Sequence, residues 1–186
     1  TELMLADLES LERQIQNLSK KIKSNDTVSK NNLYLMKKLS QFLSNGIPIR
    51  LVDLLDNEIK QIKTFNLLTS KPVLYICNVN EDHASTGNHY TKNIFSKAKA
   101  EKCDAIIISG SIESEIAKLN ENERKEFLID LNLKESGLNR LIRTGFNLLD
   151  LITFFTVGPK ETRAWTIKNN STAPEAAGII HTDFQK

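Results

Sequence analysis

The chain has 186 residues, of which 40% are hydrophobic and 26% are charged, and its formal net charge is +2. This composition is typical of one folded domain or two small ones, and it excludes wholesale disorder. No apolar run approaches the roughly 18 residues that a membrane span needs, and no signal-peptide pattern is visible, so we expect no membrane partner.

The N-terminal part of the chain predicts an antiparallel helical hairpin. Apolar residues recur at alternating spacings of 4 and 3, the pattern of a heptad seam. They are Met4, Leu8, Leu11, Ile15, Leu18 and Ile22. The polar stretch "KSNDTVSK" breaks the pattern, and a second apolar helix follows and ends at Asn45-Gly46. We expect the two helices to pack on each other, the alternative being a partner helix on the same seam.

The segment Gly46-Ile47-Pro48-Ile49 is the clearest internal boundary in the sequence. Beyond it we expect a third helix, with Asp53 as its N-cap. The apolar residues of this helix are Leu54, Leu55, Ile59 and Ile62.

The central part of the chain predicts a βαβ unit. "KPVLYIC" and "DAIIISG" indicate parallel strands buried on both faces, and "NHYTKNIFSKAKAEKC" between them is an amphipathic helix. Helical stretches follow at about 113–131 and 136–149. Two parallel strands are too few for a stable open sheet, so we expect the chain to be a fragment of a longer protein that supplies the others. The opening "TELMLADLESLE", already within a helical repeat and without an initiator Met, favours the same interpretation.

The C-terminal part predicts a β-hairpin followed by a helix. "TFFTVG" and "ETRAWTIK" are short strands joined around Gly158-Pro159. In "NNSTAPEAAGIIH", Thr172 is expected as N-cap, with Pro174 in the first turn and Glu175 near the third helical position. A hairpin followed by a helix is how a β-grasp fold begins.

Polar residues follow both predicted parallel strands. Asn78 and Glu81 follow the first strand, and Ser109, Gly110 and Ser111 follow the second. Ligands of parallel α/β sheets bind beyond the carboxyl ends of the strands, and an Asn amide matches the hydrogen-bonding edge of a purine. These residues therefore predict a pocket for a planar base, the alternative being that Asn78 caps a turn and the 109–111 segment caps a helix.

No catalytic apparatus is visible in the sequence. It contains no G-x-x-x-x-G-K-[ST] phosphate loop. His83, His89 and His181 lack partners at metal or triad spacing, so we assign no catalytic or metal-binding residue. Cys77 and Cys103 are interpreted as reduced core thiols of an intracellular protein.

Two surface features remain. The acidic residues Glu113, Glu115, Glu121, Glu123 and Glu126 are interpreted as a solvated helical face. Arg163 and Trp165 alternate along a predicted strand and therefore share one face. This pair could stack on RNA bases, the alternative being a half-buried Trp in a small core.

Four stretches of the sequence carry a family resemblance. They are "TELMLADLESLE", "LLTSKPVLYICNVNED", "ESGLNRLIRTGFNLLDLITFFTVGPKETRAWTI" and "TAPEAAGIIHTDF". Together they resemble the YchF group, the Obg-like (EngD-type) P-loop ATPases of the translation-factor class. The resemblance covers nearly the whole chain in the right order.

The resemblance implies an α/β fold in three parts. Residues 1–64 would be an antiparallel, coiled-coil-like helical insertion, and 65–149 would be the C-terminal half of a Ras-like (OBG-type) P-loop nucleotide-binding domain. Residues 150–186 would open a β-grasp TGS domain. The first half of the nucleotide domain, with its phosphate loop, magnesium ligands and switch segments, would be absent, as would the rest of TGS.

The resemblance also assigns the base-binding residues. Asn78, Val79 and Glu81 fall on the base-recognition motif, which in most relatives of the superfamily reads Asn-Lys-x-Asp, and Ser109, Gly110 and Ser111 would line the base. Val79 replaces the Lys and Glu81 replaces the Asp. The longer carboxylate is displaced from the guanine N1–H and N2–H donors, which adenine lacks, so the resemblance implies a preference for ATP.

By this resemblance the chain is a fragment of a cytoplasmic, ribosome-associated ATPase that hydrolyses ATP slowly and GTP less well. Its cofactors would be ATP and, in the full-length protein, Mg²⁺. Its partner would be the ribosome, through the large subunit, or RNA. The fragment alone is expected to be inactive, because the phosphates and Mg²⁺ would have no cradle. The alternative hypothesis is a non-enzymatic ribosome- or RNA-interaction module made of the helical hairpin and the TGS segment.

Overall fold

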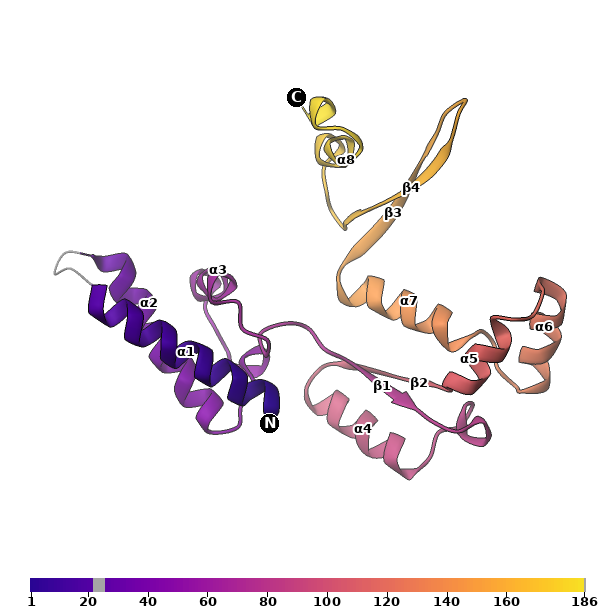
Figure 1. Ribbon diagram of the computed structural model, residues 1–186, viewed down its shortest axis with the longest axis horizontal. Coiled ribbons are helices and arrows are strands. Elements are labelled where there is room, and N and C mark those ends of the chain that lie inside the picture. The colour runs from indigo at the N-terminus through magenta and orange to yellow at the C-terminus, as the bar shows by residue number, and fades with distance from the viewer. Residues whose placement is uncertain (22–25, 186) are drawn as a thin grey trace. The chain divides into compact units, whose positions relative to one another are not determined.

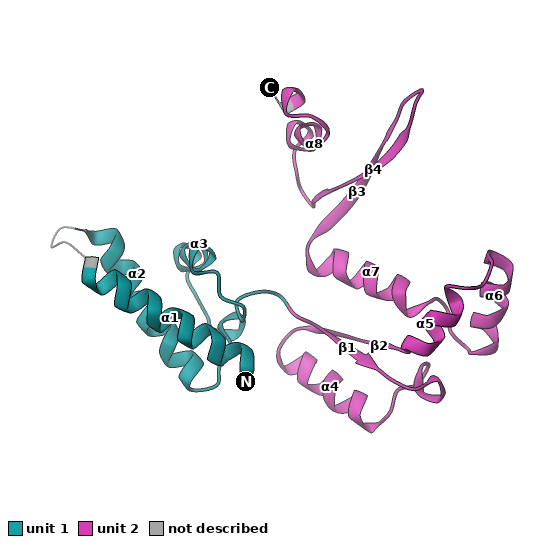
Figure 2. Cartoon of the chain, in the orientation of Figure 1, with its two compact units in different colours: residues 1–72 teal, residues 73–186 magenta. Residues whose placement is uncertain are grey.

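The computed structural model describes residues 1–21 and 26–185, and the chain divides into two compact units, residues 1–72 and 73–186 (Figure 2). Ile22 and residues 23–25 of the predicted turn lie outside the described residues. The first unit is helical and the second contains all the strands of the described chain (Figure 1).

Unit 1 opens with the predicted helical hairpin. Helix α1 spans Glu2–Lys21 and α2 spans Thr27–Ser44, and the two lie side by side (Figure 1). Asp26 caps α2 by accepting a hydrogen bond from the Ser29 N–H at 2.9 Å. The helix ends at Asn45, and Gly46 follows with a φ of +75°, a conformation that glycine adopts without strain.

The core of unit 1 lies between the two helices and the segment that follows them. Its buried residues are Leu11, Leu35, Met36, Leu39, Leu43, Ile49, Ile62, Phe65 and Leu67, with Met4, Leu8, Ile15 and Leu18 packed against them. The described part of the heptad seam therefore packs on its own second helix, as expected.

The third helix begins later than predicted. A short 3-10 turn, η1, spans Ile49–Leu51, and α3 spans Asp56–Phe65, so Asp53 is not the N-cap and Leu54 precedes the helix. Leu55 occupies the cap position, and its N–H donates to the Glu58 carboxylate at 3.0 Å. The start of α3 is therefore stabilised by the Glu58 carboxylate, one turn inside the helix, and not by Asp53.

A buried carboxylate joins the end of unit 1 to its first helix. Asp7 is 2% exposed and accepts hydrogen bonds from the Leu68 N–H, the Thr69 N–H and the Thr69 hydroxyl, each at 2.7 Å. Residues 68 and 69 therefore contact α1, and the boundary between the two compact units follows Pro72. The division into three domains stays a prediction.

Unit 2 begins with the predicted βαβ arrangement. Strand β1 (Leu74–Asn78) pairs in parallel with β2 (Asp104–Ile108), and helix α4 (His89–Ala100) connects them after a 3-10 turn, η2 (Glu81–His83). Burial of β1 on both faces is a wrong expectation, because Ile76 is 47% exposed. With a single neighbouring strand, β1 is only half covered.

The predicted helical stretch 113–131 is two helices. Helix α5 spans Gly110–Ile116 and α6 spans Glu121–Asp130. Asn120 separates them, because its side-chain oxygen accepts from the N–H groups of Asn122 and Glu123, both at 3.0 Å, and so starts a new helix. Helix α7 spans Gly137–Leu148, as expected, and contacts β2.

The C-terminal hairpin and helix agree with the sequence. Strands β3 (Leu151–Val157) and β4 (Thr162–Lys168) are antiparallel. Helix α8 spans Ala173–Ile180, and the Thr172 N–H donates to the Glu175 carboxylate at 2.7 Å, which confirms the predicted capping pair. A final 3-10 turn, η3, spans Thr182–Gln185. Within residues 1–21 and 26–185 no helix is both long and apolar enough to cross a bilayer.

Candidate functional site

The two predicted parts of the base site meet at the carboxyl ends of β1 and β2. Asn78 and Ile108 are the last pair in the parallel register. The Asn78 Oδ1 accepts a hydrogen bond from the Gly110 N–H at 3.0 Å, and the Val79 N–H donates to the Ile108 carbonyl at 2.9 Å. The strand that carries "NVNE" is thus hydrogen-bonded to the start of α5, where "SGS" lies.

This hydrogen bond identifies which atom of the Asn78 amide binds Gly110 and which remains as a donor. A backbone N–H only donates, so the atom bound to Gly110 is the amide oxygen. Asn78 is exposed, and its amide nitrogen is left as a hydrogen-bond donor at the strand ends. The alternative interpretation, in which Asn78 caps a turn and 109–111 caps a helix, agrees with part of this geometry, because Asn78 binds the first N–H of α5 and Ser109 is the N-cap residue of that helix.

The segment after β2 combines a buried and an exposed hydroxyl. Ser109 is 3% exposed, and its Oγ lies 3.0 Å from the Ser111 Oγ. Gly110 and Ser111 are exposed. Ser109 occupies the N-cap position of α5 without a side-chain cap bond, so the Asn78 oxygen satisfies the first helical N–H in its place.

Glu81 lies apart from that contact. It opens η2 and is exposed, and its carbonyl accepts from the Ala84 N–H at 3.0 Å. Within the described part of the chain its carboxylate forms neither a hydrogen bond nor an ion pair. The loop then closes through Gly87, whose N–H donates to the His83 carbonyl at 2.8 Å, and Asn88 caps α4.

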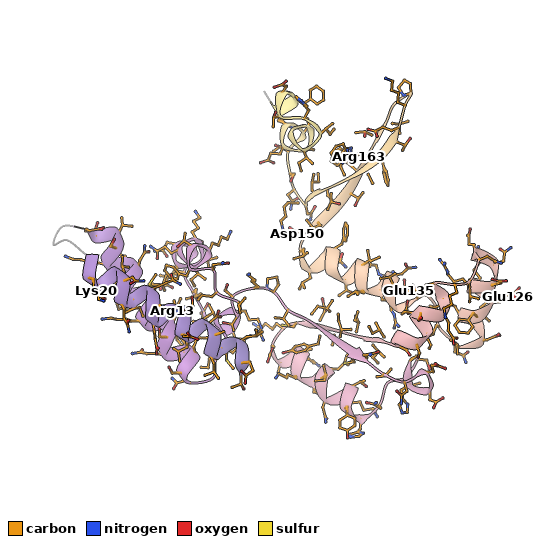
Figure 3. All side chains as sticks on the ribbon, in the orientation of Figure 1. Arg13, Lys20, Glu126, Glu135, Asp150 and Arg163 are labelled. Atoms are coloured by element: carbon orange, nitrogen blue, oxygen red, sulfur yellow. The ribbon has the colours of Figure 1, made fainter. Side chains whose placement is uncertain are left out.

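Glu113 is the functional candidate that the sequence interpretation missed. Its Oε1 accepts from the Gly137 N–H at 2.6 Å and its Oε2 accepts from the Leu138 N–H at 3.2 Å, so it caps α7. Its assignment to a solvated acidic face is therefore wrong. Glu123 and Glu126 are exposed on α6, as that interpretation expects, and the Glu123 carboxylate also accepts from the Asn120 N–H (Glu126 is labelled in Figure 3).

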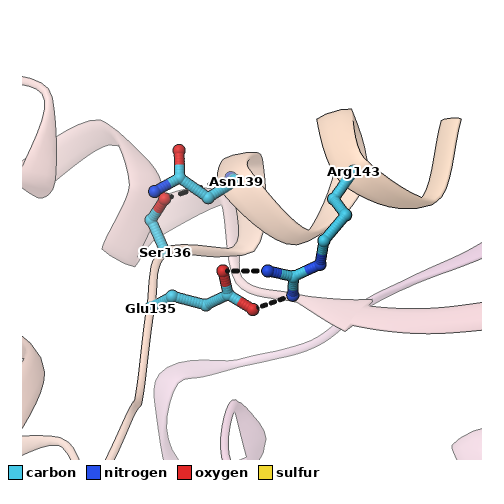
Figure 4. Close-up of polar contacts among 4 residues, drawn as sticks. All are labelled: Glu135, Ser136, Asn139 and Arg143. Atoms are coloured by element: carbon cyan, nitrogen blue, oxygen red, sulfur yellow. Dashed lines mark hydrogen bonds and ion pairs between the residues drawn. The ribbon is translucent and has the colours of Figure 1, made fainter. Parts of the chain in front are cut away.

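The start of α7 is further fixed by its own segment (Figure 4). The Ser136 hydroxyl accepts from the Asn139 N–H at 3.2 Å. Glu135 forms two parallel hydrogen bonds with the Arg143 guanidinium, one of them at 3.0 Å, and these bonds raise the pKa of Arg143 above its ordinary value. This ion pair is exposed at its Arg143 end, so its contribution to stability is small.

A cavity of about 360 Å³ borders this junction. Gly110, Glu113, Ser136 and Gly137 contribute to its wall, and the rest of its lining comes from Ile108, Ile116, Ala117, Arg124, Leu128, Leu138, Asn139 and Leu141. The cavity lies between β2, α5, α6 and α7, and Gly110, which lines it, also binds the Asn78 oxygen.

The remaining candidates do not join this site by any contact in the described chain. His83 and His89 are exposed, and His181 lies 3.5 Å from an Asp183 carboxylate oxygen. Residues 1–21 and 26–185 contain no group of three or more His, Cys, Asp or Glu side chains that could hold a metal ion. Cys77 and Cys103 are half-buried free thiols, and burial raises the pKa of Cys77.

Arg163 and Trp165 form a pair on β4. The guanidinium carbon of Arg163 lies 4.1 Å from the centroid of the Trp165 ring, a cation–π contact. Trp165 is half-buried, and its indole N–H donates to the Thr156 hydroxyl at 2.9 Å. The pair shares one strand face, as expected, and the ring is held in place by the hairpin itself.

Comparison with known proteins gives consistent matches. A family model named YchF-GTPase_C, described as "Protein of unknown function (DUF933)", matches residues 151–186. The chain is 48% identical to "Ribosome-binding ATPase YchF" of Pasteurella multocida over 186 residues, 100% of this chain and 51% of the relative. It is 41% identical to the protein of the same name from Bacillus subtilis over 187 residues, again 100% of this chain and 51% of that protein.

A solved structure agrees with these relatives. The Schizosaccharomyces pombe YchF GTPase superimposes on 99% of this chain with a TM-score of 0.86 and 34% sequence identity, and the match covers 51% of that protein. The chain spans about half the length of the curated relatives it matches. The whole chain thus aligns with about half the length of these YchF proteins, and its fold agrees with the matched part of the solved YchF structure.

Proposed function

We propose that the chain carries the base-recognition part of the ATP site of a YchF-type nucleoside triphosphatase. The observation that supports it most is the 3.0 Å hydrogen bond from the Gly110 N–H to the Asn78 Oδ1. This bond holds the two polar segments, 78–81 and 109–111, at one edge of a parallel sheet, where nucleotides bind in such folds. The curated relatives are named as ATPases, which agrees with the proposal.

The chemistry of the strand ends fits a purine. The Asn78 amide nitrogen, which does not bind Gly110, is a hydrogen-bond donor, and N7 of a purine is an acceptor. Gly110 has no side chain and Ser111 is exposed, so the backbone at 110–111 is open to the face of a flat ring. Since both adenine and guanine carry N7, Asn78 secures the base without selecting it.

Within the motif at 78–81, selection between the two purines falls to Val79 and Glu81. Relatives of the wider superfamily that bind guanine place a Lys and an Asp at these positions, by the resemblance described above. The Glu81 carboxylate is exposed, and its extra methylene shifts it from the guanine N1–H and N2–H donors. The site therefore favours ATP over GTP.

The phosphates and Mg²⁺ are assigned to the part of the relatives that this chain does not span. Residues 1–21 and 26–185 contain no group of three or more His, Cys, Asp or Glu side chains that could hold a metal ion, and the sequence contains no phosphate loop. The base alone supplies a small share of nucleotide affinity. The chain by itself is therefore expected to bind ATP no better than millimolar and not to hydrolyse it.

Two measurements test this function. Calorimetry on the 186-residue chain checks the millimolar limit, and micromolar ATP affinity would contradict it. In the full-length protein of the gene that carries this chain, Asn78→Ala is expected to weaken ATP binding roughly tenfold. Asn80→Ala is the matched control, because Asn80 is an exposed amide of the same motif whose side chain does not contact Gly110. Equal effects of the two variants would contradict the role of Asn78.

The domain boundaries belong to the same proposal. Residues 1–64 correspond to the helical insertion, 65–149 to the second half of the nucleotide domain and 150–186 to the opening of a TGS domain. This division predicts that limited proteolysis yields a fragment ending near residue 149. In that fragment the helical hairpin and the βαβ unit should remain folded.

Binding to the ribosome or to RNA is the second candidate function. The curated relatives are named ribosome-binding, and the Arg163–Trp165 pair on β4 offers a cation and an aromatic ring on one face. Arg163→Ala is expected to reduce co-sedimentation with ribosomes, and to reduce it more at low salt. Lys160→Ala, which removes a charge at the hairpin turn, is the control. Equal loss from both variants would indicate general charge attraction and not this pair.

A further inference from the structure

Three elements meet at the proposed base site, and one side chain joins two of them. Asn78, at the end of β1, binds the first N–H of α5, at Gly110. Glu113 lies one turn further along α5, and its carboxylate binds the first two N–H groups of α7. The hydrogen bonds therefore run without a break from the strand end through α5 to α7.

Helix α5 depends on these contacts for its position. It has 7 residues, and a helix of this length is not stable without tertiary contacts. Ile112 and Ile116 bury its far side in a small core with Ala84. The first turn, which carries Ser109, Gly110 and Ser111, is held by the Asn78 oxygen on one side and through Glu113 on the other.

The contact with α7 is unusually close. A Cβ atom on Gly137 would lie 2.8 Å from the Glu113 Oε1 and 3.0 Å from the Ile108 Cγ2, so a larger residue at 137 would require the Glu113 carboxylate to shift and Ile108 to move slightly. Glycine at 137 therefore allows the start of α7 to approach both the end of β2 and the Glu113 carboxylate. The negative carboxylate also lies at the positive end of the α7 helix dipole.

We propose that Glu113 is a positioning residue for purine recognition: through its hydrogen bonds to Gly137 and Leu138 it sets α5 so that Ser109–Ser111 line the base held by Asn78. This inference rests on the proposed function of the strand ends and adds a specificity-determining residue outside the base motif. Glu113 does not touch the base. Loss of the Glu113 carboxylate displaces residues 109–111, which line the base, and leaves Asn78 in place.

The test compares two ways of weakening the start of α7. Glu113→Ala removes the link between α5 and α7, whereas Ser136→Ala removes only the cap that α7 receives from its own segment, at the Asn139 N–H. Glu115→Ala, an exposed carboxylate on the same short helix, is the control for charge. Affinities for fluorescent ATP and GTP analogues are measured in the full-length protein of the gene that carries this chain.

Glu113→Ala is expected to reduce the ratio of ATP to GTP affinity roughly tenfold, because the wall that fits the base loses its position. Ser136→Ala should lower the melting temperature about as much as Glu113→Ala does, and it should leave the ratio of ATP to GTP affinity unchanged. Glu115→Ala should change neither quantity. Glu113→Gln keeps one acceptor and should rescue part of the ratio. A ratio that Glu113→Ala leaves unchanged, or that Ser136→Ala changes equally, overturns the proposal.

Hydrogen exchange of the Gly110 amide provides a readout that needs no nucleotide. In the 186-residue chain, Glu113→Ala should reduce protection of this amide, since its bond to Asn78 depends on the position of α5. Unchanged protection contradicts the positioning role. If Asn78→Ala leaves nucleotide affinity intact, the proposed function fails. If Asn78→Ala weakens binding while Glu113→Ala alters neither readout, only the positioning role fails.

Discussion

Both backbone conformation and packing constrain the identity of residue 87, which is a glycine. Its φ is +69°, and an added Cβ would lie 2.8 Å from the Ile107 Cδ1 and closer still to the Thr91 hydroxyl. It ends the loop that begins at Asn80 and leads into the cap of α4. Backbone conformation and packing thus both require glycine here.

Gly87→Ala is therefore expected to lower the free energy of unfolding by about 2–4 kcal/mol, the sum of the left-handed penalty and a core clash. Gly46→Ala is the matched control, because Gly46 has a φ of +75° and open space around it. That substitution should cost only about 1 kcal/mol. Urea unfolding measures both, and equal losses would show that the clash at Gly87 contributes nothing.

Gly145 illustrates the opposite case. It lies inside α7, its φ is not positive, and an added Cβ meets nothing within 4 Å. Alanine has the higher helix propensity, so Gly145→Ala should raise the free energy of unfolding by about 0.5–1 kcal/mol. Thermal unfolding checks this prediction, and destabilisation would mean that α7 is constrained at this position by contacts absent from the present structure.

At the scale of elements, Asp7 holds the last segment of unit 1 against α1. Its carboxylate accepts from two backbone N–H groups and one hydroxyl, and it is 2% exposed. Asp7→Ala leaves those donors without a partner, so a loss of about 2–4 kcal/mol is expected on chemical unfolding. Glu9→Ala, in an exposed ion pair with Arg13 on the same helix, should change stability by less than about 0.5 kcal/mol. A small effect of Asp7→Ala would contradict its structural role.

A second carboxylate links α3 to α2 and makes the stability of unit 1 depend on pH. The Lys38 ammonium donates to the Glu58 Oε1 at 2.7 Å, and this bond, with the one from the Leu55 N–H, lowers the pKa of Glu58 below its ordinary value. The folded state therefore binds the Glu58 proton more weakly than the unfolded state. The stabilisation is present above the unfolded pKa and is lost as pH falls through the folded pKa.

Glu58→Gln should consequently reduce the loss of stability between about pH 6 and pH 3. Guanidinium unfolding at several pH values measures the slope for the chain and the variant. Glu12→Gln, at an exposed position on α1, serves as control and should leave the slope unchanged. An identical slope for Glu58→Gln and the unsubstituted chain would rule out the proposed linkage.

Local patterns predicted most elements because each pattern reports on its own neighbourhood. The heptad spacing of Met4 to Leu18 gave α1, and the Thr172–Glu175 pair gave the start of α8. Two errors, the start of α3 and the division of 113–131 at Asn120, came from local caps, whereas other contacts were missed because the side chain acts at a distance in the sequence. Glu113 binds Gly137, 24 residues away, and Asp7 binds Leu68, 61 residues away. Neither partner is visible in periodicity or composition.

The sequence predicted where the candidate site lies, but it did not predict the contacts that hold the site in place. Parallel strand order alone placed Asn78 beside Gly110, because the carboxyl ends of parallel strands share one edge. The orientation of the Asn78 amide and the role of Glu113 required coordinates. That Asn78, Val79, Glu81 and 109–111 recognise a base stays a prediction.

At the scale of the whole molecule, the chain matches its YchF relatives over about half of their length. Its parallel sheet has two strands in the described chain, and β1 is left partly exposed. The proposed function therefore assigns recognition of the base to this chain, and it assigns recognition of the phosphates to the part of the relatives that this chain does not span. The prediction at this scale is that the chain by itself binds ATP no better than millimolar.

The most direct test of this account is a titration of the isotope-labelled 186-residue chain with ATP and then GTP, followed by backbone-amide NMR. At millimolar ATP the shifted amides should be those of residues 78–81 and 109–111, and the same concentration of GTP should shift them less. Shifts confined to other residues, or larger shifts with GTP, would contradict the assignment of the base site to the ends of β1 and β2.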